Sequence, residues 1–190
     1  MIQAGIVGGA GYTAGELIRL IIHHPALELN FVYSTSNAGN EVAQVHADLE
    51  GEALPSFTSD LNADVDVLFL CLGHGNSKKF LEEHRFSEGT HIVDLSNDFR
   101  LKEDRVLGDM EFVYGLPELN EKEISSAKYL ANPGCFATAI ELALLPLAAG
   151  GLLQDDVHVN AVTGATGAGV SLSKTTHFTW RDNNFSHYKA

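Results

Sequence analysis

The stretch GIVGGAGYTAGEL, residues 5–17, decides the fold that we expect for this chain. It places a glycine turn directly after an apolar run over residues 2–7 and directly before a helix whose apolar stripe closes before Pro25. The run LELNFVYS, beginning at residue 27, predicts a second strand. A strand, a glycine turn, a helix and a strand form a βαβ unit, and such units build a parallel sheet with right-handed crossovers.

The same alternation continues along the chain. The continuous apolar run over residues 64–73 predicts a strand buried on both faces, and residues 76–85 predict a helix. Residues 90–96 predict the next strand, and AKYLANPG (127–134) predicts another short strand and turn. The segments NDFRL and VYGLPELN between them look irregular.

We therefore expect an α/β fold, with a Rossmann-type doubly wound parallel sheet over residues 1–131. Residues 132–190 then begin a second, α+β catalytic and dimerisation domain. Its first element is an alanine- and leucine-rich helix that ends at Gly150. A half-buried strand follows, in which Val157, Val159 and Ala161 alternate, and the chain then stops in mid-domain.

Composition limits the classes of partner. The formal net charge is −13, and no lysine or arginine occurs between Arg19 and Lys78, which argues against a nucleic-acid partner. No apolar stretch is long enough to span a bilayer and the N-terminus lacks a signal-peptide pattern, so we expect a cytoplasmic protein. The two cysteines, Cys71 and Cys135, have no metal-ligand spacing, so we expect reduced thiols and no metal site.

The glycine turn matches a dinucleotide-binding fingerprint, Gly9-x-Gly11-x-x-Ala14. Glycine lets the backbone turn tightly, approach a pyrophosphate and present the amides of a helix N-terminus to it. The position of the match, after a strand and before a helix, favours this interpretation over a turn that only packs a strand against a helix.

The end of the second predicted strand favours NADP(H) over NAD. An acid that binds the ribose 2′-hydroxyl of NAD is usual about 20 residues after the glycines. Here Ser34, Thr35 and Ser36 occupy that region, and no acid occurs before Glu41. Hydroxyl groups there do not repel a 2′-phosphate and can donate to it. The alternative is an ordinary polar loop.

Cys135 follows the turn Asn132-Pro133-Gly134 and begins a helix. A thiol at a helix N-terminus lies at the positive end of the macrodipole, and the free amides there stabilise a thiolate or an oxyanion. Cys71, within an apolar run, fits a small buried residue instead. A nicotinamide site with a nucleophilic cysteine predicts a thioester that hydride reduces to an aldehyde, assisted by a general acid and base that is usually histidine.

Five collinear motifs, GIVGGAGYTAGEL, DLSNDFRL, YGLPEL, NPGCFATA and TGATGAGVSLS, resemble the N-acetyl-gamma-glutamyl-phosphate reductase family of the semialdehyde dehydrogenase superfamily. The resemblance implies an oligomeric arginine-biosynthesis enzyme that uses NADPH to reduce N-acetylglutamyl phosphate to N-acetylglutamate semialdehyde and phosphate. It implies Cys135 as the nucleophile. It also implies a pyrophosphate site at Gly8, Gly9, Ala10, Gly11, Tyr12, Thr13 and Ala14, a ribose-phosphate site at Ser34 and Ser36, and substrate contacts at Asn97, Arg100, Asn132 and Gly134.

The sequence departs from this family in two places. The position of Thr35 is often arginine in the family, and the histidine-rich segment that supplies the family's catalytic histidine has no counterpart in this sequence. We assign neither His177 nor His187 to that role, and we expect the chain to be the N-terminal part of the enzyme. The alternatives are a related reductase of aminoadipyl or aspartyl phosphate, a non-catalytic NADP-binding module, and a scaffold that binds no dinucleotide.

Overall fold

The computed structural model describes residues 1–187. The chain divides into two compact units, the first covering Met1–His158 and the second beginning at Val159. This division does not test the predicted domain boundary between residues 131 and 132, which stays a prediction. None of the helices in residues 1–187 has the length and apolar character needed to cross a membrane.

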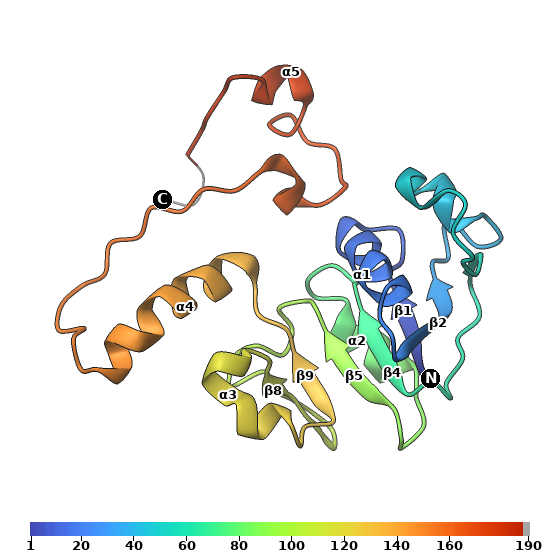
Figure 1. The fold of residues 1–190 in the computed structure, drawn as a ribbon, viewed down its shortest axis with the longest axis horizontal. Coiled ribbons are helices and arrows are strands. Elements are labelled where there is room, and N and C mark those ends of the chain that lie inside the picture. Colours follow the sequence, from blue (N-terminus) through green and yellow to red (C-terminus); the bar gives the residue numbers. More distant parts are fainter. Residues whose placement is uncertain (188–190) are drawn as a thin grey trace. The chain divides into compact units, whose positions relative to one another are not determined.

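A seven-stranded sheet forms the centre of the first unit (Figure 1). Its strand order is β3-β2-β1-β4-β5-β9-β8, and all six neighbouring pairs are parallel. The strand order reverses beside β1, as the prediction of a doubly wound sheet requires. The strands are β1 (Ile2–Val7), β2 (Leu27–Tyr33), β3 (Phe57–Thr58), β4 (Val67–Leu70), β5 (His91–Asp94), β8 (Val113–Tyr114) and β9 (Tyr129–Ala131).

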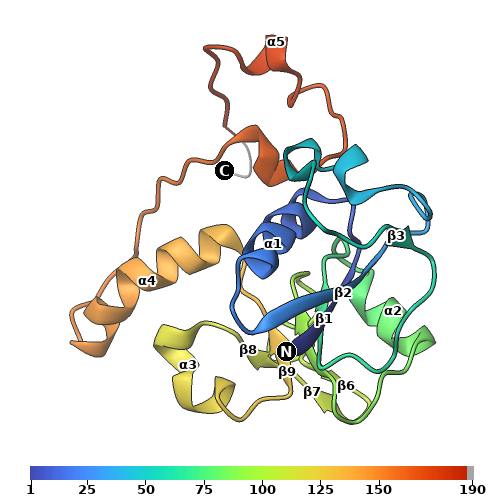
Figure 2. The ribbon, with the colours of Figure 1, turned by 45° about the vertical axis from the view of Figure 1, so that its right-hand side comes forward.

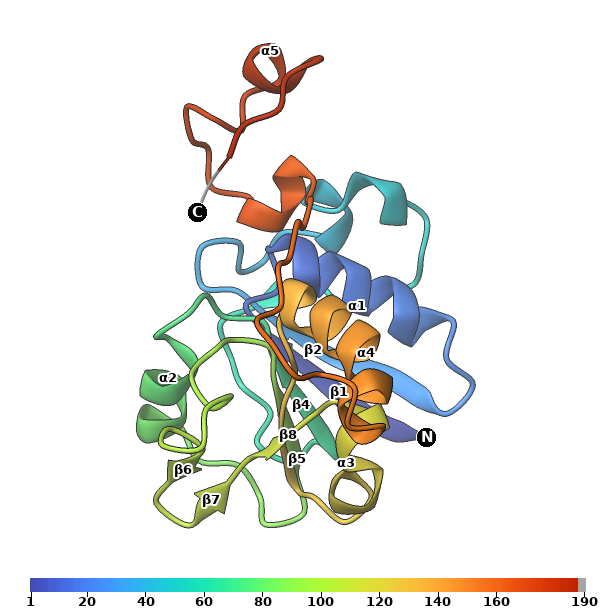
Figure 3. The ribbon, with the colours of Figure 1, turned by 90° about the vertical axis from the view of Figure 1, so that its left-hand side faces the viewer.

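Helices α1 (Tyr12–Ile22) and α2 (Ser77–Glu83) lie on opposite sides of this sheet (Figure 3). Successive side chains of a strand point to opposite faces, so β1 supplies both layers. Ile6 packs in the cluster that contains Ile18 of α1. Val7 packs in the cluster that contains Phe80 of α2. Burial on both faces explains why β4, with the sequence VLFL, is a short continuous apolar run.

Helix α4 (Cys135–Ala149) follows β9 and confirms the predicted helix. Gly134 is its N-cap and Gly150 its C-cap, and Pro146 lies in its last turn. None of its residues is fully buried, and the side chains of Leu142 and Leu147 are about two-fifths exposed, at 39% and 41%.

The region between β5 and β9 is more regular than its sequence indicates (Figure 2). Strand β8 and the start of helix α3 (Pro117–Ile124) occupy the segment VYGLPELN that looked irregular, and α3 begins with proline, which suits a first helical position. A short antiparallel hairpin, β6 (Val106–Leu107) with β7 (Met110–Glu111), turns at Gly108, whose φ is +61°.

The expected strand around Val157, Val159 and Ala161 is wrong. These residues form no ladder with any described strand, and Val157 and Val159 are 46% and 49% exposed. Alternating hydrophobicity predicts a strand only where a neighbouring strand supplies hydrogen bonds and a layer covers the apolar face. The second unit contains a 3₁₀ helix, η3 (Ala165–Ala168), and α5 (Phe178–Arg181).

Candidate functional site

The carboxyl ends of the parallel strands bring the predicted site residues to one edge of the sheet. The glycine loop follows β1, Ser34 follows β2, Asn97 lies just beyond β5 and Cys135 lies just beyond β9. The carboxyl edge next to a reversal of strand order is where open α/β sheets bind ligands. Strand β1 and strand β9 are three strand spacings apart, about 14 Å.

The glycine loop is fixed by its backbone. Gly8 has a φ of +84°, and a Cβ at this position would lie 2.6 Å from the carbonyl oxygen of Cys71, so only glycine fits. The amides of Gly8 and Gly9 both donate to the carbonyl of Tyr33, at 3.1 and 3.0 Å. Those two amides therefore hold the loop to β2 and are not available to a phosphate.

The start of α1 is the part of the loop suited to an anion. Gly11 is the N-cap, and it supplies no side-chain cap to the first turn. The first amides of a helix have no acceptor within the helix, and they carry the positive end of its dipole. Tyr12 and Thr13 are exposed there and Ala14 is buried. The loop and first turn contain all seven predicted pyrophosphate residues: Gly8, Gly9, Ala10, Gly11, Tyr12, Thr13 and Ala14.

The loop after β2 brings the two predicted serines together and adds an asparagine that the sequence analysis missed. Asn37 Nδ2 donates to Ser34 Oγ at 3.2 Å and to Ser36 Oγ at 3.1 Å. The two hydroxyl oxygens lie 3.5 Å apart, so at most one hydroxyl proton is used between them. At least one of the two serine hydroxyls can therefore donate its proton to a ligand. Thr35, between them, is exposed.

The loop after β5 holds a buried acidic group. Asp94 is fully buried, its Oδ2 accepts the hydroxyl of Ser96 at 2.7 Å, and burial raises the pKa of its carboxyl. The hydroxyl of Ser77 is near enough to oppose that rise, yet it has no partner at hydrogen-bonding geometry in the described residues. Directly after the neighbouring strand β4, burial and then the charge of Asp94 raise the pKa of Cys71 to about 12. Cys71 is therefore a neutral thiol, as the sequence predicts for a packing residue.

Two residues of this loop were predicted to contact substrate. Asn97 is exposed, and its backbone amide donates to Nδ1 of His74 at 3.1 Å. Arg100 hydrogen-bonds to the turn that precedes Cys135. Its Nε donates to the carbonyl of Asn132 at 2.8 Å, and its Nη2 donates to the carbonyl of Leu95 at 2.9 Å.

The turn before Cys135 is held by β5, through the carbonyl of Asp94, and by the side chain of Arg100. The Asn132 amide donates to the Asp94 carbonyl at 2.8 Å, and a Cβ on Gly134 would lie 3.1 Å from Nη1 of Arg100. Cys135 is the first residue of α4 and is exposed, and its helix has no side-chain cap. The thiol therefore lies at the positive end of the dipole of α4.

A tyrosine and a glutamate missed by the sequence analysis lie beside this turn. Tyr114, at the end of β8, pairs in register with Ala131, and its hydroxyl donates to the carboxylate of Glu141 at 3.1 Å. Partial burial and then Glu141 raise the pKa of Tyr114, while the charge of Arg100 opposes the rise. A tyrosine followed by glycine gives no local sign of this contact with α4, 27 residues away.

Two hollows in the first unit lie away from this edge. One of about 120 Å³ is lined by residues at the start of β5 and β9, and one of about 300 Å³ by residues at the start of β2. Both open near the amino ends of the strands, so neither coincides with the predicted site residues. His177 and His187 lie in the second unit, where His177 precedes α5.

Comparison with known proteins assigns the family. A family model described as the NAD binding domain of semialdehyde dehydrogenase matches residues 3–127, which is most of the chain. The chain belongs to the semialdehyde dehydrogenase family. A second family model, the dimerisation domain of semialdehyde dehydrogenase, matches residues 135–190. The family expected from the five motifs is confirmed.

Relatives within this family carry the name that the motifs indicated. The chain is 67% identical over 190 residues to N-acetyl-gamma-glutamyl-phosphate reductase of Christiangramia forsetii, and 60% identical over 190 residues to that of Flavobacterium johnsoniae. Each alignment covers 100% of this chain and 58% of the relative, so the chain spans little more than half of their length.

A solved structure has a fold similar to that of this chain. Aspartate semialdehyde dehydrogenase with NADP from Candida albicans matches with a TM-score of 0.54 and 17% sequence identity. The match covers 80% of this chain and 48% of that one. At this level of identity the likeness concerns the fold.

Proposed function

We propose that this chain carries the NADPH site and the nucleophile of an acyl-phosphate reductase. The substrate we propose is N-acetyl-gamma-glutamyl phosphate, reduced to N-acetylglutamate semialdehyde and phosphate in arginine biosynthesis. The names of the relatives at 67% and 60% identity support the substrate. The observation that carries the chemistry is an exposed cysteine, Cys135, at the start of α4, on the same sheet edge as the glycine loop.

The cofactor site fits a dinucleotide phosphate. An uncapped helix N-terminus after a loop that only glycine can form suits a pyrophosphate. The pair of serine hydroxyls held by Asn37 suits a ribose 2′-phosphate, and no carboxylate within the loop repels it. When bound, NADPH supplies the hydride that reduces an acyl carbon. The NADP in the related Candida albicans structure supports the choice of NADP(H) over NAD.

The chain's own residues act on the acyl group. The thiolate of Cys135 attacks the acyl carbon, a carbon–sulfur bond forms, and the bond to the phosphate oxygen breaks, so phosphate leaves with its electron pair. The amides at the start of α4 stabilise the oxyanion of the tetrahedral intermediate. Asn97 and Arg100 flank the substrate, and the guanidinium donors of Arg100 not used by Asn132 and Leu95 bind an anionic substrate group. Asn132 and Gly134 shape the turn.

The proposal is tested by following phosphate-dependent reduction of NADP with N-acetylglutamate semialdehyde by absorbance. We expect Cys135→Ser to abolish turnover and to leave NADPH binding unchanged. Cys71→Ser is the matched control, because Cys71 is the other cysteine of the chain and is partly buried against the core, and it should keep turnover in proportion to its folded fraction.

Three outcomes separate the alternatives. Turnover that survives Cys135→Ser would refute the cysteine mechanism. NADPH binding without turnover in the wild-type chain would favour a non-catalytic cofactor-binding module. Faster turnover with the semialdehydes of aminoadipate or aspartate would move the substrate assignment to a related reductase.

We also propose that the protein is a cytoplasmic homo-oligomer. The match to a dimerisation domain over residues 135–190 supports self-association, and a mechanism that needs a reduced thiol suits the cytoplasm. The apolar side chains exposed along α4, among them Leu142 and Leu147, offer a surface that an oligomer would cover. Light scattering would give the mass in solution, and a monomer across the micromolar range would contradict the proposal.

A further inference from the structure

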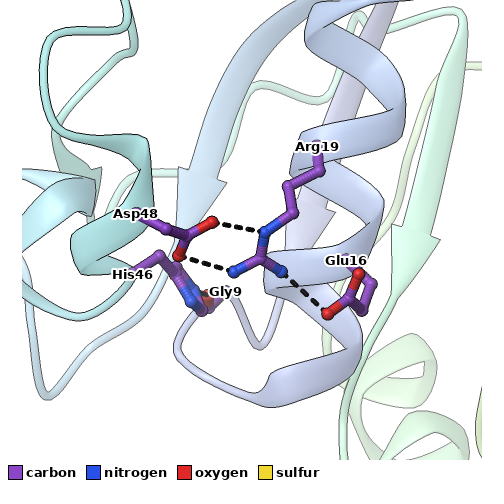
Figure 4. Close-up of polar contacts among 5 residues, drawn as sticks. All are labelled: Gly9, Glu16, Arg19, His46 and Asp48. Atoms are coloured by element: carbon purple, nitrogen blue, oxygen red, sulfur yellow. Dashed lines mark hydrogen bonds and ion pairs between the residues drawn. The ribbon is translucent and has the colours of Figure 1, made fainter.

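A histidine that is far from the glycine loop in sequence forms a hydrogen bond with that loop. His46 lies between two short 3₁₀ helices, η1 (Val42–Gln44) and η2 (Ala47–Leu49), and is only 7% exposed. Its Nε2 lies 2.8 Å from the carbonyl oxygen of Gly9 (Figure 4). A carbonyl oxygen only accepts, so Nε2 carries the proton of this hydrogen bond.

The ring lies against the first turn of α1 because Gly15 has no side chain. A Cβ at Gly15 would lie 2.7 Å from Nδ1 of His46 and 2.8 Å from its Cε1. Those distances are too short for any alanine, so the ring and residue 15 cannot both keep their places after Gly15→Ala. Glycine is less favourable than alanine within a helix, and the contact with His46 explains why glycine occupies this position.

The segment that carries His46 is attached to α1 at a second point. Asp48 accepts Nε of Arg19 at 2.6 Å and Nη2 at 2.7 Å, in a two-pronged arrangement (Figure 4). Arg19 also pairs with Glu16, at 3.0 Å. Val42 and Leu49 are buried in the core cluster beneath α1. His46 is therefore held by a packed and ion-paired segment.

The hydrogen bond has a consequence for the loop. A peptide group is planar and trans, so the carbonyl of Gly9 and the amide of Ala10 point in opposite directions in one plane. Binding the carbonyl from one side fixes the direction of the Ala10 amide on the other. We propose that His46 is a positioning residue of the dinucleotide site, which orients the Gly9–Ala10 peptide so that the loop is preorganised for a pyrophosphate. This inference rests on the proposed function.

The test compares two ligands in variants of the full chain. NADPH contains the pyrophosphate, whereas 2′-AMP carries the ribose 2′-phosphate alone. We expect His46→Leu to weaken NADPH binding roughly five- to tenfold, as loss of one positioning hydrogen bond implies, and to leave 2′-AMP binding unchanged within about twofold. His46→Gln, whose amide nitrogen can take the place of Nε2, should restore most of the NADPH affinity.

Two further variants keep the test decisive. Gly15→Ala displaces the ring without changing His46, and it should reproduce the effect of His46→Leu even if His46→Leu folds poorly. His84→Leu is the matched control, since Nδ1 of His84 also bonds a backbone carbonyl, that of Phe80 at 3.0 Å, but at the end of α2. It should leave the affinity for both ligands unchanged.

The outcomes separate this inference from the proposed function. A wild-type chain that does not bind NADPH would refute the cofactor site itself. A wild-type chain that binds NADPH while His46→Leu and Gly15→Ala bind it equally well would refute the positioning role alone. Equal losses for NADPH and 2′-AMP would mean that His46 only supports folding, and would also overturn the inference.

Discussion

Arg100 Nε donates to the carbonyl oxygen of Asn132 at 2.8 Å, three residues before Cys135. The same guanidinium donates to the carbonyl of Leu95 at 2.9 Å, so it joins the loop after β5 to the turn after β9. Planar guanidinium donors can satisfy two carbonyls at fixed angles, which an ammonium cannot do. The residue expected to bind substrate therefore also fixes the turn that presents the thiol.

Arg100→Lys tests this structural role. Lysine keeps the positive charge, but its single nitrogen cannot occupy the positions of both Nε and Nη2, so we expect the free energy of unfolding to fall by about 1–2 kcal/mol. We also expect phosphate-dependent turnover to fall at least tenfold. Arg105→Lys is the control, because Arg105 pairs with Glu111 on the surface at 2.7 Å and such pairs contribute little. Equal melting curves for Arg100→Lys and the wild type would show that the two hydrogen bonds add no stability.

Gly8→Ala tests the constraint on the glycine loop. Alanine at a φ of +84° is strained by about 1–2 kcal/mol, and its Cβ would meet the Cys71 carbonyl at 2.6 Å. We expect the free energy of unfolding to fall by about 3 kcal/mol, measured in urea. Gly39→Ala is the matched control, since its φ is +87° but a Cβ there meets nothing within 4 Å. The difference between the two variants isolates the contact with Cys71, and similar losses would show that this contact costs nothing.

The sheet was predictable because its signals are local. Strand β4 is a continuous apolar run, and β1, β2, β5 and β9 are short segments rich in apolar residues, while the parallel order follows from the alternation with helices. The start of α4 at Cys135 was also readable from the Asn-Pro-Gly turn before it. Helix α3 was missed because it has no fully buried residue and little apolar periodicity.

The supporting contacts were not predictable from local patterns. His46 reaches Gly9 across 37 residues, and Tyr114 reaches Glu141 across 27. Such contacts depend on how the elements pack, which a single sequence does not reveal. The strand predicted near Val159 is wrong for a different reason. Its local pattern is present in the sequence, but no strand among the described residues pairs with it.

The two cysteines should differ in reactivity. Cys135 is exposed, whereas burial and the charge of Asp94 raise the pKa of Cys71 to about 12. We expect iodoacetamide at pH 8 to modify Cys135 and to spare Cys71 in the folded chain, because the thiolate is the reactive species. Both should react in urea. Rapid modification of Cys71 in the folded chain, located by peptide mass spectrometry, would contradict its raised pKa.

The same raised pKa predicts an alkaline loss of stability. In the unfolded chain Cys71 titrates near the ordinary thiol value of 9.0, and in the folded chain near 12. The folded state binds the proton more tightly, so the stabilisation is fully present below pH 9 and is lost as the pH rises toward 12. Cys71→Ala should therefore flatten the decline in melting temperature between pH 9 and about 11. An unchanged decline in this variant would assign it to other groups.

Asp98 should give the opposite dependence at acid pH. Its Oδ1 accepts the amide of Gly75 at 2.6 Å and its Oδ2 accepts that of Lys78 at 3.0 Å, so it caps α2 from the loop after β5. Partial burial acts to raise the pKa of Asp98, but the hydrogen bonds from the Lys78 and Gly75 amides outweigh it and the pKa is lowered. The stabilisation is therefore present above the ordinary aspartate value, near pH 4, and is lost as the pH falls through the lower folded value.

Asp98→Asn removes the charge and one of the two acceptors. We expect the free energy of unfolding to fall by about 1 kcal/mol at pH 7, and the difference from the wild type to shrink as the pH falls below about 4. Asp104→Asn is the control, because Asp104 is an exposed aspartate in the loop before β6. Urea titrations at pH 7 and pH 3 measure both variants. A difference that stays constant between these values would mean that Asp98 stabilises α2 through its shape and not through its ionised form.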